Sequence, residues 1–395
     1  MELLVGILAG ITAMTNKNDK ILIARNSHKS VYNAVEINSL VPIYLYPKQD
    51  EYGINKEIKP KDVKEKLENN KDIKLLVITS PTYEGVISNI KEIVEIAHSY
   101  KVPVLVDEAH GAHLNFDRKL KEFEALKGGA DIVVQSLHKT LPSLTQTALL
   151  HIQGNMVQEN EIYNALSIFE TSSPSYILMA SIDNCLNILE KDREKLFKAY
   201  NENLEKFYEK TKNLEKLKIL GQVITKNDIQ DMGKIVVITK NTNINGKKLA
   251  ETLREKYKIE VEMAYTDYII AMTSICDKKE NFEKFADALI KIDKEVQKIE
   301  EKEIKSQEFY IIPKKEMEIY ETKKSKNKIK TIYKKAEGKI SNEYIFVYPP
   351  GIPYITPGEV IDKNVISKIE EFMKNEIEIR TTSNSFPEIE IIEND

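Results

Sequence analysis

The first half of the chain alternates between short apolar runs and segments with helical spacing. Strands are predicted for the apolar runs at 21–24, 41–47, 74–80, 102–108, 131–136 and 147–152. Helices are predicted for the apolar first fourteen residues and for 27–39, 59–70 and 89–100. Nearly continuous Val, Ile and Leu runs joined by helices predict an α/β fold with a mostly parallel sheet covered on both faces.

The second half of the chain contains three kinds of sequence pattern: long helical segments, a smaller unit of alternating strands and helices, and a charged segment that ends in a polar tail. Helical spacing at 156–170 and 176–210 leads into a smaller α/β unit, with strands predicted at 234–240 and 268–275 and helices at 246–257 and 281–303. Residues 301–337 are rich in Lys and Glu, which predicts a linker with helical pieces on the surface. The polar tail from about 380 is predicted to be loose. We therefore expect three domains, at 1–205, 206–300 and 301–395.

Composition narrows the class of protein. The 395 residues carry a net charge of −4, which argues against a dedicated nucleic-acid binder because such proteins usually carry a basic surplus. The apolar amino-terminal run is too short to span a membrane and follows no basic segment, so it predicts a buried helix and no membrane partner. Cys185 and Cys276 lie in no metal-ligand spacing, which indicates free thiols and a cytoplasmic protein.

Two of the predicted strands end in reactive side chains. Asp107, His110 and His113 follow the run VLV, and Ser136, His138 and Lys139 follow the run IVVQ. Neighbouring parallel strands would bring the acid and the amine to one rim of the sheet. Pyridoxal phosphate (PLP) needs a lysine amine that forms an imine with its aldehyde and a carboxylate that keeps its pyridine nitrogen protonated. This pair of strand ends therefore suits PLP.

Other functions fit the same residues less well. The letters DEAH at 107–110 also occur in helicases, but no phosphate loop of the form GxxxxGK[ST] precedes them. The His, Asp and Glu side chains at 107–113 could bind a metal, but further ligands at suitable spacing are missing, so we predict no metal. An adjacent His and Lys are usually solvated, whereas here they follow a buried strand.

Five segments then resemble one family in its own order. They are TSPTYEGVISNI (79–90), VLVDEAHGAHLNF (104–116), ADIVVQSLHKTLPSLTQTALLH (130–151), TSSPSYILMASID (171–183) and YPPGIPYITPGE (348–359). Together they closely resemble the Orn/Lys/Arg decarboxylases of the aspartate-aminotransferase fold (fold type I). The resemblance implies a PLP-binding large domain at 1–205, a small α/β domain at 206–300 and the family's C-terminal domain after the linker that begins at 301.

The resemblance also implies roles for single residues. Lys139 is similar to the lysine that carries PLP, and Asp107 to the partner of the pyridine nitrogen. His28 is similar to the histidine that stacks on the cofactor ring, and His110 to a residue that borders it. Lys139, Asp107 and His28 would then be the catalytic residues.

Three further residues resemble positions around the cofactor. Ser136 is similar to a phosphate-side residue and His138 to the residue that flanks the lysine. Ser172 resembles a hydroxyl that reaches the cofactor site of a neighbouring subunit. That likeness implies a homodimer or a higher homo-oligomer with shared active sites.

The function implied is PLP-dependent decarboxylation of arginine, lysine or ornithine to the amine and CO2, as in polyamine biosynthesis. The amino terminus departs from the family, which usually has a longer segment and then a phosphate-binding turn resembling NGSTxGILA. Here the chain begins MELLVGILAG, with Leu3 and Leu4 in place of Ser and Thr, so we expect an N-terminally truncated member. A catalytically impaired interaction subunit is the alternative, and an aminotransferase or another lyase of this fold is a third possibility.

Overall fold

A large six-stranded sheet organises the first half of the chain in the computed structural model, which describes residues 2–223, 229–299, 312–348 and 351–393. Its strands, in spatial order, are β2 (Val41–Leu45), β1 (Lys20–Ala24), β3 (Ile73–Thr79), β5 (Val104–Asp107), β6 (Ile132–Ser136) and β7 (Ala148–Ile152). All neighbouring strands are parallel except β7, which runs antiparallel to β6. The predicted mostly parallel sheet is confirmed.

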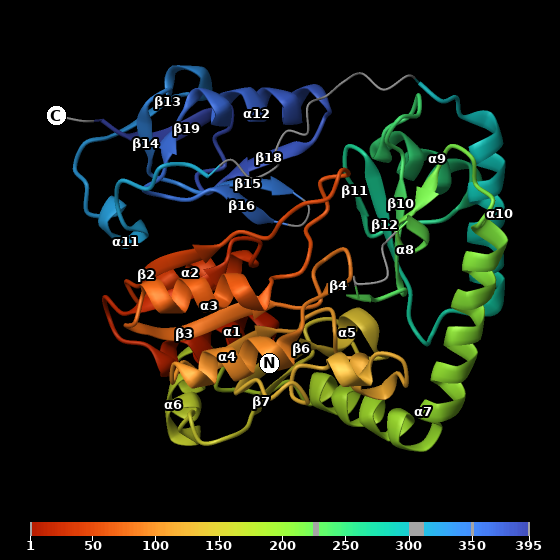
Figure 1. Cartoon of the computed structure of the whole chain (residues 1–395), viewed down its shortest axis with the longest axis horizontal. Helices are drawn as coiled ribbons and strands as arrows, with labels where there is room; N and C mark the ends of the chain where they lie inside the picture. The colour runs from red at the N-terminus through yellow and green to blue at the C-terminus, as the bar shows by residue number, and fades with distance from the viewer. Residues whose placement is uncertain (1, 224–228, 300–311, 349–350, 394–395) are drawn as a thin grey trace.

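Helices cover both faces of this sheet, as Figure 1 shows. Ile21 and Ile23 of β1 pack in one core with α1 (Leu3–Met14), α2 (Lys29–Ile37) and α6 (Glu159–Phe169). Leu22 and Ala24 of the same strand pack in another core with α3 (Pro60–Asn69) and α4 (Ile90–Ser99). Successive strand residues point to opposite faces, so a strand that is buried on both faces is apolar at every position.

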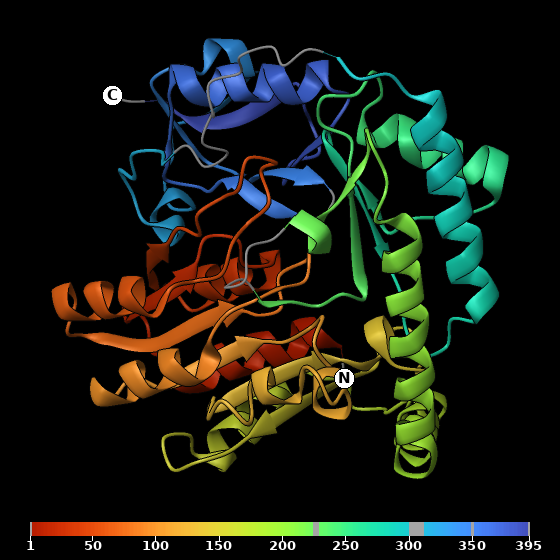
Figure 2. The ribbon, with the colours of Figure 1, turned by 45° about the vertical axis from the view of Figure 1, so that its right-hand side comes forward.

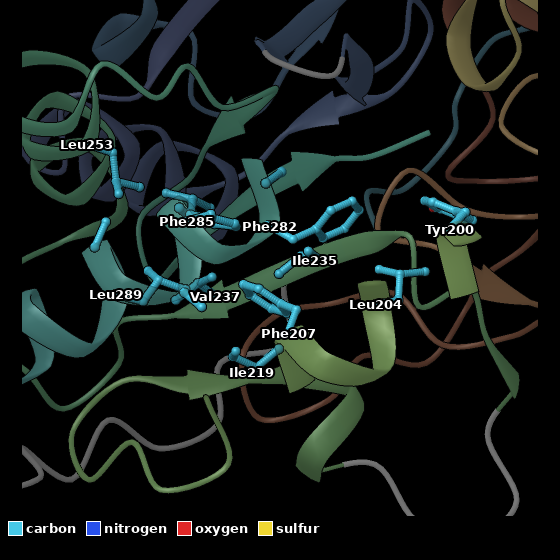
Figure 3. Close-up of a cluster of buried hydrophobic side chains, with 14 of the residues drawn as sticks. Tyr200, Leu204, Phe207, Ile219, Ile235, Val237, Leu253, Phe282, Phe285 and Leu289 are labelled. Atoms are coloured by element: carbon cyan, nitrogen blue, oxygen red, sulfur yellow. The ribbon is translucent and has the colours of Figure 1, made fainter. Parts of the chain in front are cut away.

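The second unit contains an antiparallel sheet with helices packed against it. Its strands are, in spatial order, β11 (Met263–Ala264), β12 (Tyr268–Met272), β10 (Lys234–Ile238) and β8 (Lys218–Ile219). Its helices are α8 (Leu220–Val223), α9 (Gly246–Tyr257) and α10 (Lys279–Glu295). The long helix α7 (Tyr176–Thr211) runs along both units (Figure 2). In their shared core, the rings of Phe207 and Phe285 stack with centroids 5.4 Å apart (Figure 3).

The prediction of a helix over 281–303 is wrong at its carboxyl end. Helix α10 ends at Glu295, and buried Val296 has extended backbone angles. The following residues form backbone hydrogen bonds with residues 241–243, and Lys298 bridges to Thr242. Residues 300–303 of the predicted helix lie outside the described residues.

Two further secondary-structure predictions are wrong in the C-terminal unit. Strand β13 (Lys328–Ile332) lies within the predicted linker, and β19 (Glu388–Ile392) within the tail that was expected to be loose. The two strands pair in a sheet with β14 (Lys339–Ser341) and β17 (Val360–Ile361). Ile389 and Ile391 of β19 are buried, so its alternating Glu and Ile residues form a strand with one apolar face. Linker residues 301–311 lie outside the described residues.

A second, three-stranded sheet completes this unit. It contains β16 (Ile352–Ile355), β15 (Ile345–Tyr348) and β18 (Glu378–Thr381), and α12 (Lys363–Lys374) packs nearby. The remaining short elements are α5 (Leu137–Thr140), α11 (Ile319–Thr322), the pair β4 (Val86–Ile87) and β9 (Ile229–Gln230), and 3-10 turns at Leu114–Phe116, Lys121–Phe123 and Tyr333–Lys335.

The buried side chain of Arg25, which follows β1 of the large sheet, contacts the C-terminal unit. The guanidinium of Arg25 donates to the carbonyl oxygens of Pro353 and Tyr354, at 2.5 and 3.0 Å, and lies 3.4 Å from the carboxylate of Glu359. It also faces the ring of Tyr44. Both partners of this ion pair have side chains only 1% exposed.

The domain boundaries at 205 and 300 stay a prediction, because α7 runs across the first and the second falls at a residue outside those described. Within the described part of the chain, no helix is both long and apolar enough to cross a bilayer.

Candidate functional site

The carboxyl ends of β5 and β6 form the base of the candidate site. The two strands are adjacent and parallel, and Asp107 pairs in register with Val134. Helix α5 begins directly after β6 and carries Lys139. The Nζ atom of Lys139 lies 3.2 Å from Nε2 of His110, which follows β5. The structure therefore joins the two strand ends through an amine and an imidazole.

Asp107 is a buried carboxylate beside this amine. Its side chain accepts a hydrogen bond from the backbone N–H of Ala109 at 3.1 Å. Burial raises the pKa of Asp107, while the positive charge of Lys139 and the Ala109 N–H oppose that rise. Burial in turn lowers the pKa of Lys139, although Asp107 and Glu262 act in the other direction. Lys139 is thus easier to deprotonate than a solvated lysine.

His28 follows β1, a parallel strand whose carboxyl end lies at the same rim of the sheet. Its Nδ1 accepts a hydrogen bond from the backbone N–H of Ser30 at 3.3 Å and so caps α2. Burial and the charges of Lys139 and Lys29 lower the pKa of His28 to about 4. The imidazole is therefore neutral at pH 7 and lies within the electrostatic reach of Lys139.

Lys234 is a site residue that the sequence did not reveal. It is the first residue of β10, is 2% exposed, and its Nζ lies 2.7 Å from Nδ1 of His110. In the sequence it is an ordinary lysine before an apolar run, 124 positions from His110. Only the packing of the second unit against the large sheet brings the two together.

A tyrosine and a glutamate border the same imidazole. The ring of Tyr83 meets the His110 ring edge-on, with centroids 5.0 Å apart. The Tyr83 hydroxyl donates to Oε1 of Glu262 at 2.7 Å. Glu262 is solvent-exposed, and its charge acts on both Lys139 and Lys234. An exposed carboxylate therefore lies near the amines.

His113, which also follows β5, points to a different partner. Its Nε2 lies 3.3 Å from the carboxylate of Asp231, and both side chains are almost fully buried. Burial alone would raise the pKa of Asp231, but His113 and Lys234 hold it below its ordinary value. Asp231 is therefore a buried anion whose charge acts on Lys234.

Ser136 and His138 lie on either side of the turn between β6 and α5. The Ser136 hydroxyl is buried and has no hydrogen-bond partner in the part of the chain that the structure describes. The Nδ1 of His138 donates to the carbonyl oxygen of Thr147 at 3.0 Å, which fixes the orientation of its ring. The expected position of Ser136 on the phosphate side and the expected role of His138 as the residue that flanks the lysine stay predictions.

Ser172 lies apart from these residues. It is exposed, in the loop between α6 and α7. Over residues 2–223, 229–299, 312–348 and 351–393, no hydrogen bond or ion pair connects it with the other predicted site residues. The expected contact with a neighbouring subunit stays a prediction.

A metal site was the alternative use of the residues at 107–113. Among the described residues, no three His, Cys, Asp or Glu side chains gather in a group that could hold a metal ion. His113 and Asp231 form a pair, and His110 is contacted by two amines instead.

Known sequences match almost the whole chain. The family described as Orn/Lys/Arg decarboxylase, major domain, matches residues 5–232, and the C-terminal domain of the same family matches residues 302–390. The arginine decarboxylase of Bacillus subtilis (strain 168) is 33% identical over 371 residues, covering 92% of this chain and 75% of that protein. The constitutive lysine decarboxylase of Escherichia coli (strain K12) is 27% identical over 210 residues, covering 50% of this chain and 29% of that protein.

Solved structures share the fold. Lysine decarboxylase A from Pseudomonas aeruginosa superposes with a TM-score of 0.82 at 17% identity, covering 99% of this chain and 68% of that one. An alanine–glyoxylate aminotransferase from Nostoc sp. superposes with a TM-score of 0.57 at 13% identity, covering 74% of this chain and 79% of that one. The predicted α/β fold of the type I aminotransferases is confirmed. With both of its domains matched in sequence, the chain belongs to the Orn/Lys/Arg decarboxylase family, whose members are amino-acid decarboxylases.

Proposed function

We propose that this protein decarboxylates a basic amino acid (arginine, lysine or ornithine) with PLP as cofactor and releases the corresponding amine and CO2. The observation that carries the proposal is the contact of the Lys139 amine with His110 at 3.2 Å, beside buried Asp107. The names of the relatives, arginine decarboxylase and lysine decarboxylase, support the substrate class.

The residues at the strand ends fit this cofactor. Lys139 offers an amine whose pKa is lowered by burial, as a group that bonds to an aldehyde requires. Asp107 offers a buried acid for the pyridine nitrogen. The buried hydroxyl of Ser136, which has no hydrogen-bond partner among the described residues, offers a donor for the phosphate. A hydrogen bond to the phosphate would remove the cost of leaving this buried polar atom unsatisfied.

When bound, PLP supplies a protonated pyridine ring that accepts the electron pair left as the substrate loses CO2. Asp107 as an anion would keep the proton on that ring nitrogen. His28 would offer a neutral imidazole to the ring, because its pKa of about 4 leaves it uncharged at pH 7. Lys139 would hold the cofactor through its amine.

Glu262 supports a cationic substrate. Its carboxylate is exposed, is held by the Tyr83 hydroxyl at 2.7 Å, and acts electrostatically on Lys139. A guanidinium or ammonium side chain entering near Lys139 therefore meets a fixed negative charge. The choice among arginine, lysine and ornithine depends on the reach of that side chain.

We further infer that the working form is a cytoplasmic homodimer or higher oligomer. Large apolar side chains are exposed around the loop that carries Ser172, with Tyr176 79%, Ile177 74% and Ile168 70% exposed. Exposed apolar side chains grouped in this way mark an interface. A second subunit that covers them would also bring its site close to Ser172.

The proposal is tested by CO2 release from arginine, lysine and ornithine, each with added PLP. We expect release from at least one of them by the wild-type protein and none by Lys139→Ala. A keto acid formed without CO2 would identify an aminotransferase instead. Firm PLP binding without any product from the three substrates would favour the interaction subunit.

A further inference from the structure

We propose that the cavity between α7 and residues 230–233 is a second binding site, which takes an aliphatic diamine or polyamine. The cavity has a volume of about 500 Å³. Its wall is formed by one side of α7, by residues 117 and 119–120, and by residues 221–222 and 230–233. Lys139 is not among the described residues that line it, so the cavity is separate from the candidate active site.

Helix α7 gives the cavity an apolar wall. Tyr200, Leu204 and Tyr208 are spaced four residues apart, so they lie on one face of the helix, where Figure 3 shows the first two. The Tyr208 hydroxyl donates to the carbonyl oxygen of Met232 at 2.9 Å, and the Tyr200 hydroxyl lies 2.9 Å from Oγ1 of Thr273. Because both hydroxyls already have partners, the tyrosines mainly offer a ligand their ring carbons. Methylene groups gain from contact with such a wall.

Asp117 gives the cavity one buried carboxylate. It is 3% exposed and accepts hydrogen bonds from the backbone N–H of Lys119 at 2.8 Å and from the side-chain amide of Asn201 at 3.3 Å. The ammonium of Lys119 pairs with Glu205 instead. Within the described ranges, no lysine or arginine forms an ion pair with Asp117. A buried carboxylate in this situation gains from a cation that reaches it.

Asp231 gives the cavity a second buried carboxylate. It is also 3% exposed, accepts a hydrogen bond from the backbone N–H of Gly233 at 2.9 Å, and lies 3.3 Å from Nε2 of His113. The charge of Lys234 acts on it, but no lysine or arginine in the described part of the chain forms an ion pair with it. The cavity therefore borders two buried anions.

The remaining polar groups also favour a hydrogen-bond donor with positive charge. Gln230 lines the cavity and is 9% exposed, and its Oε1 is buried with no hydrogen-bond partner among the described residues. An amide oxygen only accepts hydrogen bonds, whereas an ammonium offers three N–H donors. The two lysines at the wall, Lys119 and Lys212, pair with Glu205 and Glu209. The carboxylates at the wall therefore outnumber the lysines.

Together these features select the chemistry of the ligand. Two buried carboxylates in one cavity favour a molecule with two cationic groups, and an apolar wall favours methylene groups between them. An anionic ligand would meet charges of its own sign. Aliphatic diamines and polyamines combine two or more ammonium groups with a methylene chain. The amines released by the proposed reaction are chemically related, but the cavity selects this class without reference to that reaction.

The first test is isothermal titration calorimetry of the full chain without cofactor. Putrescine, cadaverine and spermidine are the compounds titrated, with butylamine, which has one ammonium group, and butanediol, which has none, as controls. We expect at least one of the three amines to bind, butylamine to bind about 10-fold more weakly, and butanediol not to bind. No binding of the three amines at millimolar concentration, or equal binding of butylamine, overturns the proposal.

The second test locates the bound amine with substitutions. Asp117→Asn and Asp231→Asn should each weaken binding of the preferred amine about 10-fold and remove its advantage over butylamine, because one anion is lost. Leu120→Trp keeps both carboxylates and fills the cavity, so it should abolish binding. Asp131→Asn, which alters a buried carboxylate elsewhere, should leave the affinity unchanged. Unchanged binding in the Asp117 and Leu120 variants contradicts the proposal.

A further variant distinguishes this cavity from the candidate active site. Glu262→Gln should leave the titration unchanged, because Glu262 is not among the described residues that line the cavity. Loss of binding in Glu262→Gln alone would place the amine beside Lys139 and overturn the proposal. Should either aspartate variant unfold, Leu120→Trp decides, since Leu120 is only partly buried and carries no charge. Neither test requires PLP or turnover, so failure of the proposed function would leave both results valid.

Discussion

The amine of Lys139 lies 3.2 Å from Nε2 of His110, although the two residues follow different strands and are 29 positions apart in the chain. The parallel pairing of β5 and β6 places them at one rim, since both side chains come just after the carboxyl ends of these strands. The contact makes Lys139 part of a buried polar group and not a solvated surface lysine.

Asp107→Asn should remove the charge that keeps the cofactor ring protonated while preserving the shape of the side chain. We expect kcat to fall about 100- to 1000-fold, as for the loss of other fixed electrostatic partners, with PLP still attached through Lys139. Asp131→Asn is the matched control, because Asp131 is buried at the opposite end of the same sheet and bonds to His98. A kcat that is unchanged in Asp107→Asn would refute the role of this acid.

Glu262→Gln should weaken binding of the cationic substrate. Because Glu262 is exposed, we expect only about a 3- to 10-fold increase in KM, with kcat nearly unchanged. Steady-state kinetics on the preferred basic amino acid measure this change. Glu260→Gln, which removes a surface partner of Arg254, should leave KM unchanged. An equal effect of both substitutions would exclude Glu262 from substrate recognition.

Arg25→Met should destabilise the whole chain by separating the C-terminal unit from the sheet. It leaves Glu359 buried without the cation beside it and removes the hydrogen bonds that Arg25 donates to the carbonyl oxygens of Pro353 and Tyr354. Losing one partner of a buried pair costs about 3–5 kcal/mol in the free energy of unfolding, which urea titration measures. Arg254→Met, which breaks an exposed Arg–Glu pair, should change the urea midpoint little. Equal midpoints would contradict this assignment.

Ile177→Asp should convert the proposed homodimer into a monomer. Ile177 is 74% exposed in the single chain, and a charge there cannot be buried cheaply in an interface. Light scattering should give the mass of two chains or more for the wild-type protein and of one chain for the variant. Met373→Asp alters another exposed apolar residue, 44% exposed, on α12 and should leave the mass unchanged. An unaltered mass in Ile177→Asp would place the interface elsewhere.

The strands of the large sheet were predictable because burial on both faces favours consecutive apolar residues, as at positions 75–78 of β3, which are all apolar and buried. The strands β13 and β19 could not be predicted because neither is buried on both faces. In β13 no side chain is fully buried, with Ile329 38% and Ile332 37% exposed, and charge density dominates the sequence pattern. In β19, Glu and Ile alternate, which resembles a polar tail in sequence.

Some residues of the candidate site were also predictable from the sequence, and others were not. Asp107 and Lys139 directly follow apolar strands, so their order in the chain already indicates a shared rim. Lys234 reaches the site from a strand of another sheet, and no local pattern reveals a contact made across 124 positions. The long separation in sequence, and not an unusual residue type, hid the contact of Lys234 with His110.

The proposed attachment of the cofactor to the amine of Lys139 can be measured directly. Incubation with PLP, reduction with borohydride and peptide mass spectrometry locate the modified lysine. We expect the reduced cofactor on the peptide that contains Lys139 and its absence in Lys139→Ala. A label found instead on Lys234 or on a surface lysine, or a wild-type protein that takes up none, would refute the role of Lys139.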